Sequence, residues 1–370
     1  MSALAESAGP GGAVARRAVR PVLVTGGAGF IGSHIADRVA SSGRDVLVFD
    51  SLCRPGVAQN LEWLRKRHPR RLSTAIDDVR NPDALSAAAD EAGAVFHMAA
   101  QVAVTTSLTE PLADFAVNLQ ATVALLESLR GRRTPLVFAS TNKVYGDLAD
   151  LRLERQGDAY RPVDRDVGCY GVGEDRGLDF HTPYGCSKGA ADQYVLDYAR
   201  HFDVPTAVFR MSCIYGPRQR GTEDQGWIAH FAIRALAGEE ISIFGDGCQV
   251  RDILYVDDAV DAYMAALARM PSVAGHAFNL GGGPANAVSL RQVLGRIGAL
   301  LGRPVSVRHD EWRSGDQRYY VSDTRKARRM LALEPPRDWR SGVADLVAWL
   351  MQEQPRSGAA RAEPRLETAL

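Results

Sequence analysis

Residues 21–32 read PVLVTGGAGFIG, and the last three of them begin an amphipathic stretch that runs to residue 43. A short apolar run, a glycine-rich turn and a helical pattern in this order are typical of a dinucleotide-binding unit. Glycine allows the tight turn and the close approach of the backbone to a pyrophosphate, and the amides at the start of the helix suit a diphosphate. An ordinary glycine turn is the alternative. The residues expected to bind the dinucleotide here are Gly26, Gly29, Phe30, Ile31 and Gly32.

Further apolar runs alternate with helical patterns through residue 210. They read DVLVFD at 45–50, RLSTAI at 71–76, AVFHMAA at 94–100, PLVFAS at 135–140 and PTAVFR at 205–210. Several are apolar throughout, as expected for strands that are covered on both faces. Alternating strands and helices predict an α/β fold, a Rossmann-type doubly wound parallel sheet.

Beyond Arg210, turn-rich segments separate shorter elements and predict a smaller α/β substrate-binding lobe. We expect the helix at 256–269 and the run at 276–281 to return to the first lobe. Residues 147–180 lie between two candidate active-site segments, and a lid over the substrate is one interpretation. The expected organisation is a disordered leader at 1–18, a dinucleotide-binding domain at 19–210 plus 252–280, the substrate lobe at 211–251 plus 281–352, and a flexible tail at 353–370.

Composition disfavours several classes of function. The formal charge of the 370 residues is zero and no long basic run appears, which argues against nucleic-acid binding. No apolar run approaches the roughly 20 residues that cross a bilayer, and the N-terminal residues do not read as a secretory signal. The five cysteines lie far apart, which argues against both a disulfide framework and a metal site and suits a reducing cytoplasm.

Acidic residues that follow the second and third strands point to the identity of the dinucleotide. Asp50 ends the second strand, 18 residues after Gly32, where a carboxylate accepts from a ribose 2′-hydroxyl and repels a 2′-phosphate. This favours NAD over NADP, although Arg54 could soften the preference. Asp78 could accept from the adenine amine, or it could be a simple loop acid. Val79 and Ala99 complete the expected NAD-binding set.

Tyr184 and Lys188 stand four residues apart, and Thr141 follows the strand at 135–140. Active groups of open α/β sheets gather at such carboxyl ends. We expect Tyr184 to exchange a proton, Thr141 to hold the substrate oxygen, and Lys188 to hold the nicotinamide ribose while its charge favours the phenolate. In the alternative interpretation Thr141 caps a strand and Tyr184 is a surface residue.

Arg251 and Arg313 lie on turn-rich segments of the second lobe. Guanidinium groups grip diphosphates through paired hydrogen bonds, so both are candidates for binding a diphosphate. Surface salt bridges are the alternative.

Several motifs resemble the extended short-chain dehydrogenase/reductase family, the group of nucleotide-sugar epimerases and dehydratases. They are TGGAGFIG, FHMAAQ, STNKVYG, YGCSK, YGPRQ, IFGDGCQVRD and RSGDQR, and the resemblance as a whole runs over about residues 22–349. The resemblance implies that Thr141, Tyr184 and Lys188 form a catalytic triad and that Arg251 and Arg313 bind the nucleotide diphosphate. The substrate-binding residues expected with them are Gln101, Asn142, Lys143 and Gln225.

The residues after Thr141 bear on the type of reaction. Dehydratases of this family carry Asp and Glu there, whereas this chain has Asn142 and Lys143, which cannot supply that acid and base pair. The blocks STNKVYGDL, DFHTPYGCSKGAADQY and DQGW are similar to the subgroup of CDP-paratose 2-epimerases, also called CDP-tyvelose epimerases. Many relatives have asparagine where this chain has Cys213, a departure that this subgroup shares.

The resemblance therefore implies an isomerase, an NAD-dependent epimerase of a nucleotide-diphosphate sugar that inverts C2, with a CDP-sugar favoured. A 4-epimerase, a ketoreductase with net NADH use and a non-catalytic NAD-binding regulatory protein remain alternatives. The helices after Asn118 and after Lys188 have apolar faces beyond those that the sheet needs. The equivalent helices of the family form a dimer interface, which predicts a homodimer or a tetramer.

Overall fold

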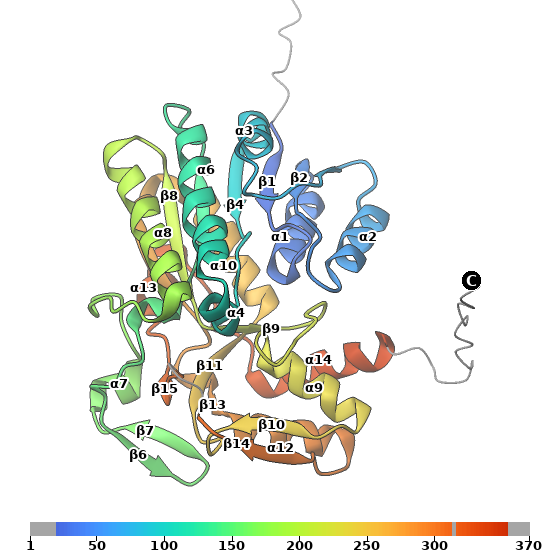
Figure 1. Cartoon of the computed structure of the whole chain (residues 1–370), viewed down its shortest axis with the longest axis vertical. Coiled ribbons are helices and arrows are strands. Elements are labelled where there is room, and N and C mark those ends of the chain that lie inside the picture. The colour runs from blue at the N-terminus through green and yellow to red at the C-terminus, as the bar shows by residue number, and fades with distance from the viewer. Residues whose placement is uncertain (1–19, 313–315, 354–370) are drawn as a thin grey trace, which may run out of the picture.

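The structure is a computed structural model that describes residues 20–312 and 316–353 (Figure 1). The expected leader at 1–18 and Arg313 lie outside the described residues. So does the expected tail apart from Glu353, which ends a helix.

A seven-stranded parallel sheet forms the centre of the larger lobe (Figure 1), as the sequence predicts. Its strands run in the order β12, β8, β5, β4, β1, β2, β3. Most are short apolar runs buried along their whole length, which fits strands covered on both faces. Their bounds are β1 Val22–Thr25, β2 Val46–Phe49, β3 Leu72–Ala75, β4 Ala94–His97, β5 Leu136–Thr141, β8 Thr206–Met211 and β12 His276–Leu280.

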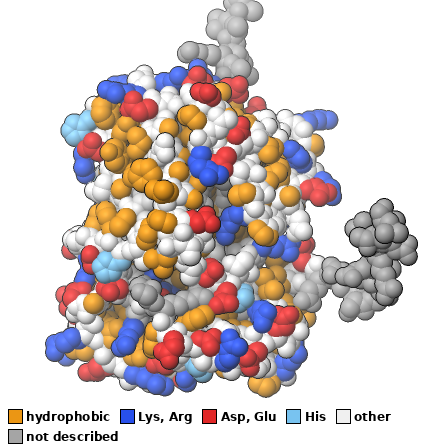
Figure 2. Space-filling view, viewed as in Figure 1, with side chains coloured by type: hydrophobic (Ala, Val, Ile, Leu, Met, Phe, Trp, Pro, Cys, Tyr) orange, Lys and Arg blue, Asp and Glu red, His pale blue; other side chains and the backbone are white. Residues whose placement is uncertain are grey.

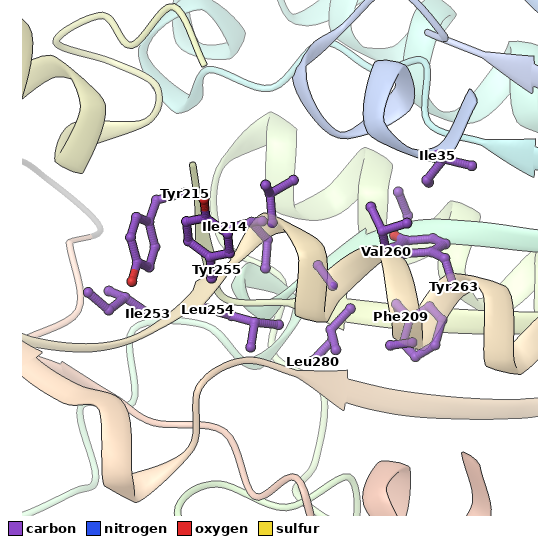
Figure 3. Packing of buried hydrophobic residues seen from close by; sticks show 14 of the residues in the cluster. Ile35, Phe209, Ile214, Tyr215, Ile253, Leu254, Tyr255, Val260, Tyr263 and Leu280 are labelled. Atoms are coloured by element: carbon purple, nitrogen blue, oxygen red, sulfur yellow. The ribbon is translucent and has the colours of Figure 1, made fainter. Parts of the chain in front are cut away.

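Helices cover both faces of this sheet and give it two separate cores. One face carries α1 (Phe30–Ser41), α2 (Val57–Arg67) and α10 (Val256–Ala268), and the other carries α3 (Pro82–Glu91), α6 (Ala121–Leu129) and α8 (Thr182–His201). Figure 3 shows Tyr263 of α10 packed over Phe209 of β8, with ring centroids 4.8 Å apart. As expected, α10 and β12 therefore belong with the first lobe.

The helical run Pro111–Leu129 corrects one expectation. It comprises α5 (Pro111–Phe115), a π-helical turn (Ala116–Gln120) and α6, and over its 19 residues the mean hydropathy of 1.2 would suffice for a membrane span by length and composition. Buried core helices pass the same test. Here Leu125 and Leu126 pack in the core of the sheet, so we describe the run as a core helix.

The second lobe is built on smaller sheets below the first (Figure 1). The strand β11 is central to it, because it pairs with β9, β13 and β15, while β10 pairs with β14. The domain boundaries given above stay a prediction. The bounds here are β9 Cys213–Tyr215, α9 Trp227–Ala237, β10 Ile241–Phe244, β11 Val250–Tyr255, β13 Ala287–Ser289, α12 Leu290–Leu301, β14 Val307–Asp310, β15 Tyr319–Tyr320, α13 Arg325–Leu331 and α14 Trp339–Glu353, while the short α11 (Met270–Val273) lies between α10 and β12 and packs against β8.

The insert at 147–180 is not a lid over the cleft that is described below. It forms a hairpin, β6 (Leu153–Gln156) and β7 (Ala159–Pro162), followed by α7 (Arg165–Tyr170). Ala159 is buried against Val250 and Tyr319 of the second lobe, and Tyr160 donates to the Asp246 carboxylate at 2.7 Å. Burial of this apolar face holds the insert beneath the lobe, and none of residues 147–180 lines the cleft.

Candidate active site

A single cleft of about 960 Å³ contains every described residue that the sequence analysis assigned to a site. It lies where the carboxyl ends of the parallel strands meet the second lobe, the usual position of ligands in open α/β sheets. The assigned residues that line it are Gly26, Gly29, Phe30, Ile31, Gly32, Asp50, Arg54, Asp78, Val79, Ala99, Gln101, Thr141, Asn142, Lys143, Tyr184, Lys188, Gln225 and Arg251.

The glycine turn between β1 and α1 is a cradle that side chains would fill. A Cβ on Gly32 would lie 2.1 Å from the Gly26 carbonyl oxygen, and a Cβ on Gly26, which has φ +64°, would lie 2.7 Å from the Ala99 nitrogen. The helix α1 begins at Phe30, and its first residues line the cleft. The turn therefore fits the diphosphate of a dinucleotide against a helix N-terminus.

Asp50 is held rigidly at the end of β2. Its two carboxylate oxygens accept from the Ala28 amide at 3.0 Å and the Leu52 amide at 2.9 Å. Because these amides fix the carboxylate beside the glycine turn, it is placed to meet the ribose that adjoins the diphosphate.

Asp78 has a partner that the sequence analysis missed. The Arg80 guanidinium donates to both of its oxygens, at 2.9 and 2.8 Å, and this pairing lowers the pKa of Asp78. Since both oxygens are engaged, the contact of Asp78 with adenine stays a prediction.

Thr141 and Tyr184 meet across the ends of β5 and α8. The Thr141 oxygen accepts from the Lys143 amide at 3.2 Å, which fixes the threonine at the strand end. Tyr184, only 9% exposed, lies in the first turn of α8, close enough to the Thr141 side chain for the two to interact. Thr141 does cap the turn after β5, as the alternative interpretation has it, but Tyr184 is buried and is not the surface residue of that interpretation.

The acidity of Tyr184 differs from what the sequence led us to expect. Burial raises its pKa to about 12, while the hydrogen bond with Thr141 acts in the opposite direction. Lys188 is 2% exposed, and burial lowers the pKa of its amine to about 7. Its nitrogen lies 4.2 Å from the centre of the Phe138 ring. Burial thus dominates both pKa shifts, because a low-dielectric site disfavours both charged forms.

Asn142 connects the two lobes. Its amide nitrogen donates to the Gln317 side chain at 3.2 Å, and Gln317 donates to the Gly146 carbonyl at 2.5 Å. The Thr141 hydroxyl lies 3.4 Å from the Asn142 amide oxygen. A chain of hydrogen bonds therefore links the strand end that carries Thr141 to the segment that precedes β15.

Positive charge gathers on the second-lobe side of the cleft. Arg251 pairs with Asp316 at 2.6 Å, and the Lys143 amine lies 4.0 Å from the same carboxylate. Burial first, and then the charge of Arg251, lower the pKa of Lys143 to about 8, against the opposing effect of Asp316. Asp316 was missed in the sequence, although it stands inside the motif RSGDQR.

Cys213, where many relatives have asparagine, lies on β9 and lines the cleft. The Trp227 indole donates to its sulfur at 3.3 Å, and burial raises the pKa of the thiol. The cysteine is therefore a neutral, weakly polar contact at this position, and Trp227 lines the cleft beside it.

Comparison with known proteins gives a consistent result. Residues 22–281 match the model of the NAD dependent epimerase/dehydratase family. The CDP-paratose 2-epimerase of Salmonella typhi is 38% identical over 337 residues, covering 89% of this chain and 98% of that protein. The UDP-glucose 4-epimerase of Mycolicibacterium smegmatis is 32% identical, covering 88% and 96%.

A solved structure agrees. The UDP-glucuronic acid 4-epimerase from Bacillus cereus, crystallised with UDP-glucuronic acid and NAD, matches with a TM-score of 0.77 and 26% identity, covering 90% of this chain and 99% of that chain. With the glycine cradle, the fixed Asp50 and the Thr141, Tyr184 and Lys188 group in one cleft, these matches lead to one conclusion. The chain is an NAD-dependent enzyme that belongs to the NAD dependent epimerase/dehydratase family.

Proposed function

We propose that this enzyme epimerises a nucleotide-diphosphate sugar at C2, with a CDP-sugar of the paratose and tyvelose type as substrate. The observation that carries the proposal is the pair that follows Thr141. Asn142 donates to Gln317, and Lys143 is a half-buried amine, so neither offers the carboxylate acid and base that water elimination requires. The CDP-paratose 2-epimerase of Salmonella typhi, with 38% identity, supports the choice of C2 and of CDP.

The proposed chemistry assigns one task to each side chain. When bound, NAD accepts a hydride from the sugar carbon and gives it back. Tyr184 takes the proton of the sugar hydroxyl and later returns it, and Thr141 holds the oxygen in line through its hydroxyl. Lys188 binds the nicotinamide ribose and stabilises the phenolate form of Tyr184 by its charge. Because hydride and proton both return, the overall reaction inverts one centre without net redox change.

The second lobe would bind the diphosphate. Arg251 and Lys143 supply the positive charge of the cleft, and Asp316 holds the guanidinium in place. Paired donors of a guanidinium match two phosphate oxygens, whereas the lysine acts as a point charge. Arg313, Gln101 and Gln225 stay predicted contacts, and the latter two line the cleft.

Inversion at C4 is the second candidate. Its support is that the Mycolicibacterium smegmatis relative, at 32% identity, is a UDP-glucose 4-epimerase. The two candidates differ in which sugar carbon reaches the position next to Tyr184, and hence in how the sugar is rotated in the cleft.

A substrate panel tests the proposal. The purified enzyme is incubated with CDP-, UDP-, GDP- and dTDP-sugars, and the products are identified by NMR. The proposal expects inversion at C2 of a CDP-sugar, without consumption of added NADH. Inversion at C4 would select the second candidate, and stoichiometric oxidation of NADH would identify a ketoreductase instead.

We also propose that the enzyme is at least a homodimer. Exposed apolar side chains gather on α5, on α8 and on α4 (Val104–Thr109), among them Leu112, 82% exposed, and Phe115, 48% exposed. Figure 2 shows hydrophobic side chains collected over the face of α4, α6 and α8. A contiguous apolar patch on a folded protein is typical of an interaction site.

A further inference from the structure

A carboxylate without an ionic partner lies beside the proposed catalytic pair. Asp114 on α5 is fully buried, at 0% exposed. Its oxygens accept from the Gln101 amide at 3.0 Å, from the Asn118 amide at 3.1 Å and from the Ser187 hydroxyl. Buried carboxylates are found only where hydrogen bonds compensate the loss of water, and three neutral donors do so here.

These hydrogen bonds join three separate segments of the site. Gln101 belongs to the loop after β4, Asn118 to the π-helical turn after α5, and Ser187 to α8. The Ser187 hydroxyl also lies 3.2 Å from the Tyr184 carbonyl oxygen. Ser187 stands between Tyr184 and Lys188 along the helix, so its bond to Asp114 fixes the turn that carries both.

A second buried carboxylate near Lys188, that of Asp192, differs from Asp114 because it forms an ion pair. Asp192 receives the Arg210 guanidinium at 3.0 and 2.9 Å and the Ser140 hydroxyl at 2.7 Å. Its charge is therefore balanced by a contacting cation. Asp114 forms no ion pair with any residue in the described ranges 20–312 and 316–353. Among nearby cations, Lys188 is the one that acts on it.

The charged and titratable groups around Lys188 are few. Within the described residues they are Tyr184 and Asp192 on α8, Arg210 on β8, which pairs with Asp192, Asp114 on α5 and His97 on β4. Burial keeps the His97 imidazole neutral, since its pKa is lowered to about 3. Asp114 opposes the loss of charge on Lys188 and also disfavours the phenolate of Tyr184.

We propose that Asp114 is a positioning residue of this active site, which holds the Tyr184–Lys188 turn of α8 through Ser187 and whose negative charge, not balanced by a contacting cation, favours the protonated amine of Lys188. The inference rests on the proposed function only in taking Tyr184 and Lys188 as the working pair. It requires that Asp114 be ionised at neutral pH. Burial is the largest effect and raises the pKa of Asp114, while the three donors and Lys188 act in the opposite direction and favour the ionised form.

The test is a titration of the lysine side chains by NMR. Protein labelled with ¹³C-lysine is purified with its NAD, and the Cε shifts are followed from pH 5 to pH 10 in the parent and in Asp114→Asn. Asparagine keeps the shape and can still bond Ser187, Gln101 and Asn118, so the change is mainly one of charge. We expect the pKa of Lys188 to fall by roughly one unit, the effect of one nearby opposite charge.

Lys143 is the internal control. The described groups that act most on its charge are Arg251, Asp316, Cys213 and Asp147, and Asp114 is not among them, so its resonance should titrate at the same pH in both proteins. Lys143→Arg and Lys188→Arg assign the two resonances. An unchanged titration of Lys188 in Asp114→Asn, or an equal change at Lys143, would overturn the proposal.

Two further variants separate the effect of the Asp114 charge from the effect of its hydrogen bond to α8. Ser187→Ala keeps the carboxylate but removes its bond to α8. It should lower the rate while the pKa of Lys188 stays near that of the parent, and a pKa shift as large as in Asp114→Asn would contradict the assignment of the charge. If Asp114→Asn does not fold, Asp114→Ser removes the same charge with a smaller side chain and must show the same fall. The titration needs no substrate, so it remains decisive even if the enzyme converts no CDP-sugar.

Discussion

Arg251 and Asp316 form an ion pair 2.6 Å apart that joins β11 to the segment before β15. The Lys143 amine lies 4.0 Å from the same carboxylate. Two cations and one anion thus share a half-buried part of the cleft, and the excess positive charge suits a substrate diphosphate. Because partial burial and the neighbouring Arg251 lower the pKa of Lys143 to about 8, the charge of this cluster changes in mildly alkaline solution.

The affinity for substrate should therefore fall in mildly alkaline solution. An amine is charged below its pKa, so Lys143, with a pKa of about 8, carries its charge below pH 8 and loses it above. We expect KM for the nucleotide sugar to rise between pH 8 and pH 9. Lys143→Arg keeps the charge throughout and should remove that rise, whereas Lys66→Arg, at a 75% exposed side chain, should not. Identical KM profiles for the parent and Lys143→Arg would refute this role.

The hydroxyl of Tyr184 is expected to be essential for turnover but not for holding NAD. Tyr184→Phe removes the group that exchanges the proton, and loss of such a group lowers rates by about 10²–10⁴-fold. Steady-state kinetics measure the rate, and the absorbance of the released nucleotide measures bound NAD. Tyr170→Phe, at an exposed position on α7, is the matched control and should keep full activity. An active Tyr184→Phe enzyme would show that another group is the base.

The glycine cradle should be intolerant of a single methyl group. In Gly32→Ala the new Cβ would meet the Gly26 carbonyl oxygen at 2.1 Å, so the turn must open and the enzyme should purify without NAD. Gly295→Ala is the control, because a Cβ there meets nothing within 4 Å in the middle of α12, where alanine is favoured over glycine by about 0.5–1 kcal/mol. Full NAD content in Gly32→Ala would mean that this turn does not bind the diphosphate.

The positions of the strands and of the first helix were predictable from the sequence, and the reasons are physical. Short apolar runs such as residues 46–49 are covered on both faces and therefore show no alternation of polar residues. The four-residue spacing of Tyr184 and Lys188 predicts that they share one face of a helix. Both residues lie on α8 and both are buried there.

What depends on tertiary burial was not predictable. The raised pKa of Tyr184 follows from burial by segments far apart in the chain, and local sequence carries no sign of it. Asp114 looks like an ordinary helical acid until Ser187, 73 residues later, donates to it. The insert at 147–180 was interpreted as a lid because its chain neighbours line the cleft, yet the apolar face of its hairpin packs beneath the second lobe.

The apolar face of α4, α5 and α8 should hold two subunits together. Phe115→Glu places a charge in that face, and we expect it to convert a dimer at micromolar concentration into a monomer by light scattering. Met351→Glu, at a 57% exposed apolar side chain on α14, should leave the mass unchanged. A parent protein that is already monomeric at that concentration would contradict the assignment of this face.

The most direct test of the proposed reaction is the fate of one hydrogen. A CDP-sugar of the paratose or tyvelose type is prepared with deuterium on C2, incubated with the enzyme in ordinary water, and the epimer is analysed by NMR. The account predicts that the inverted C2 keeps its deuterium, because the hydride leaves and returns within one active site while Tyr184 handles only the hydroxyl proton. Loss of the deuterium to solvent, or inversion at a carbon other than C2, would contradict it.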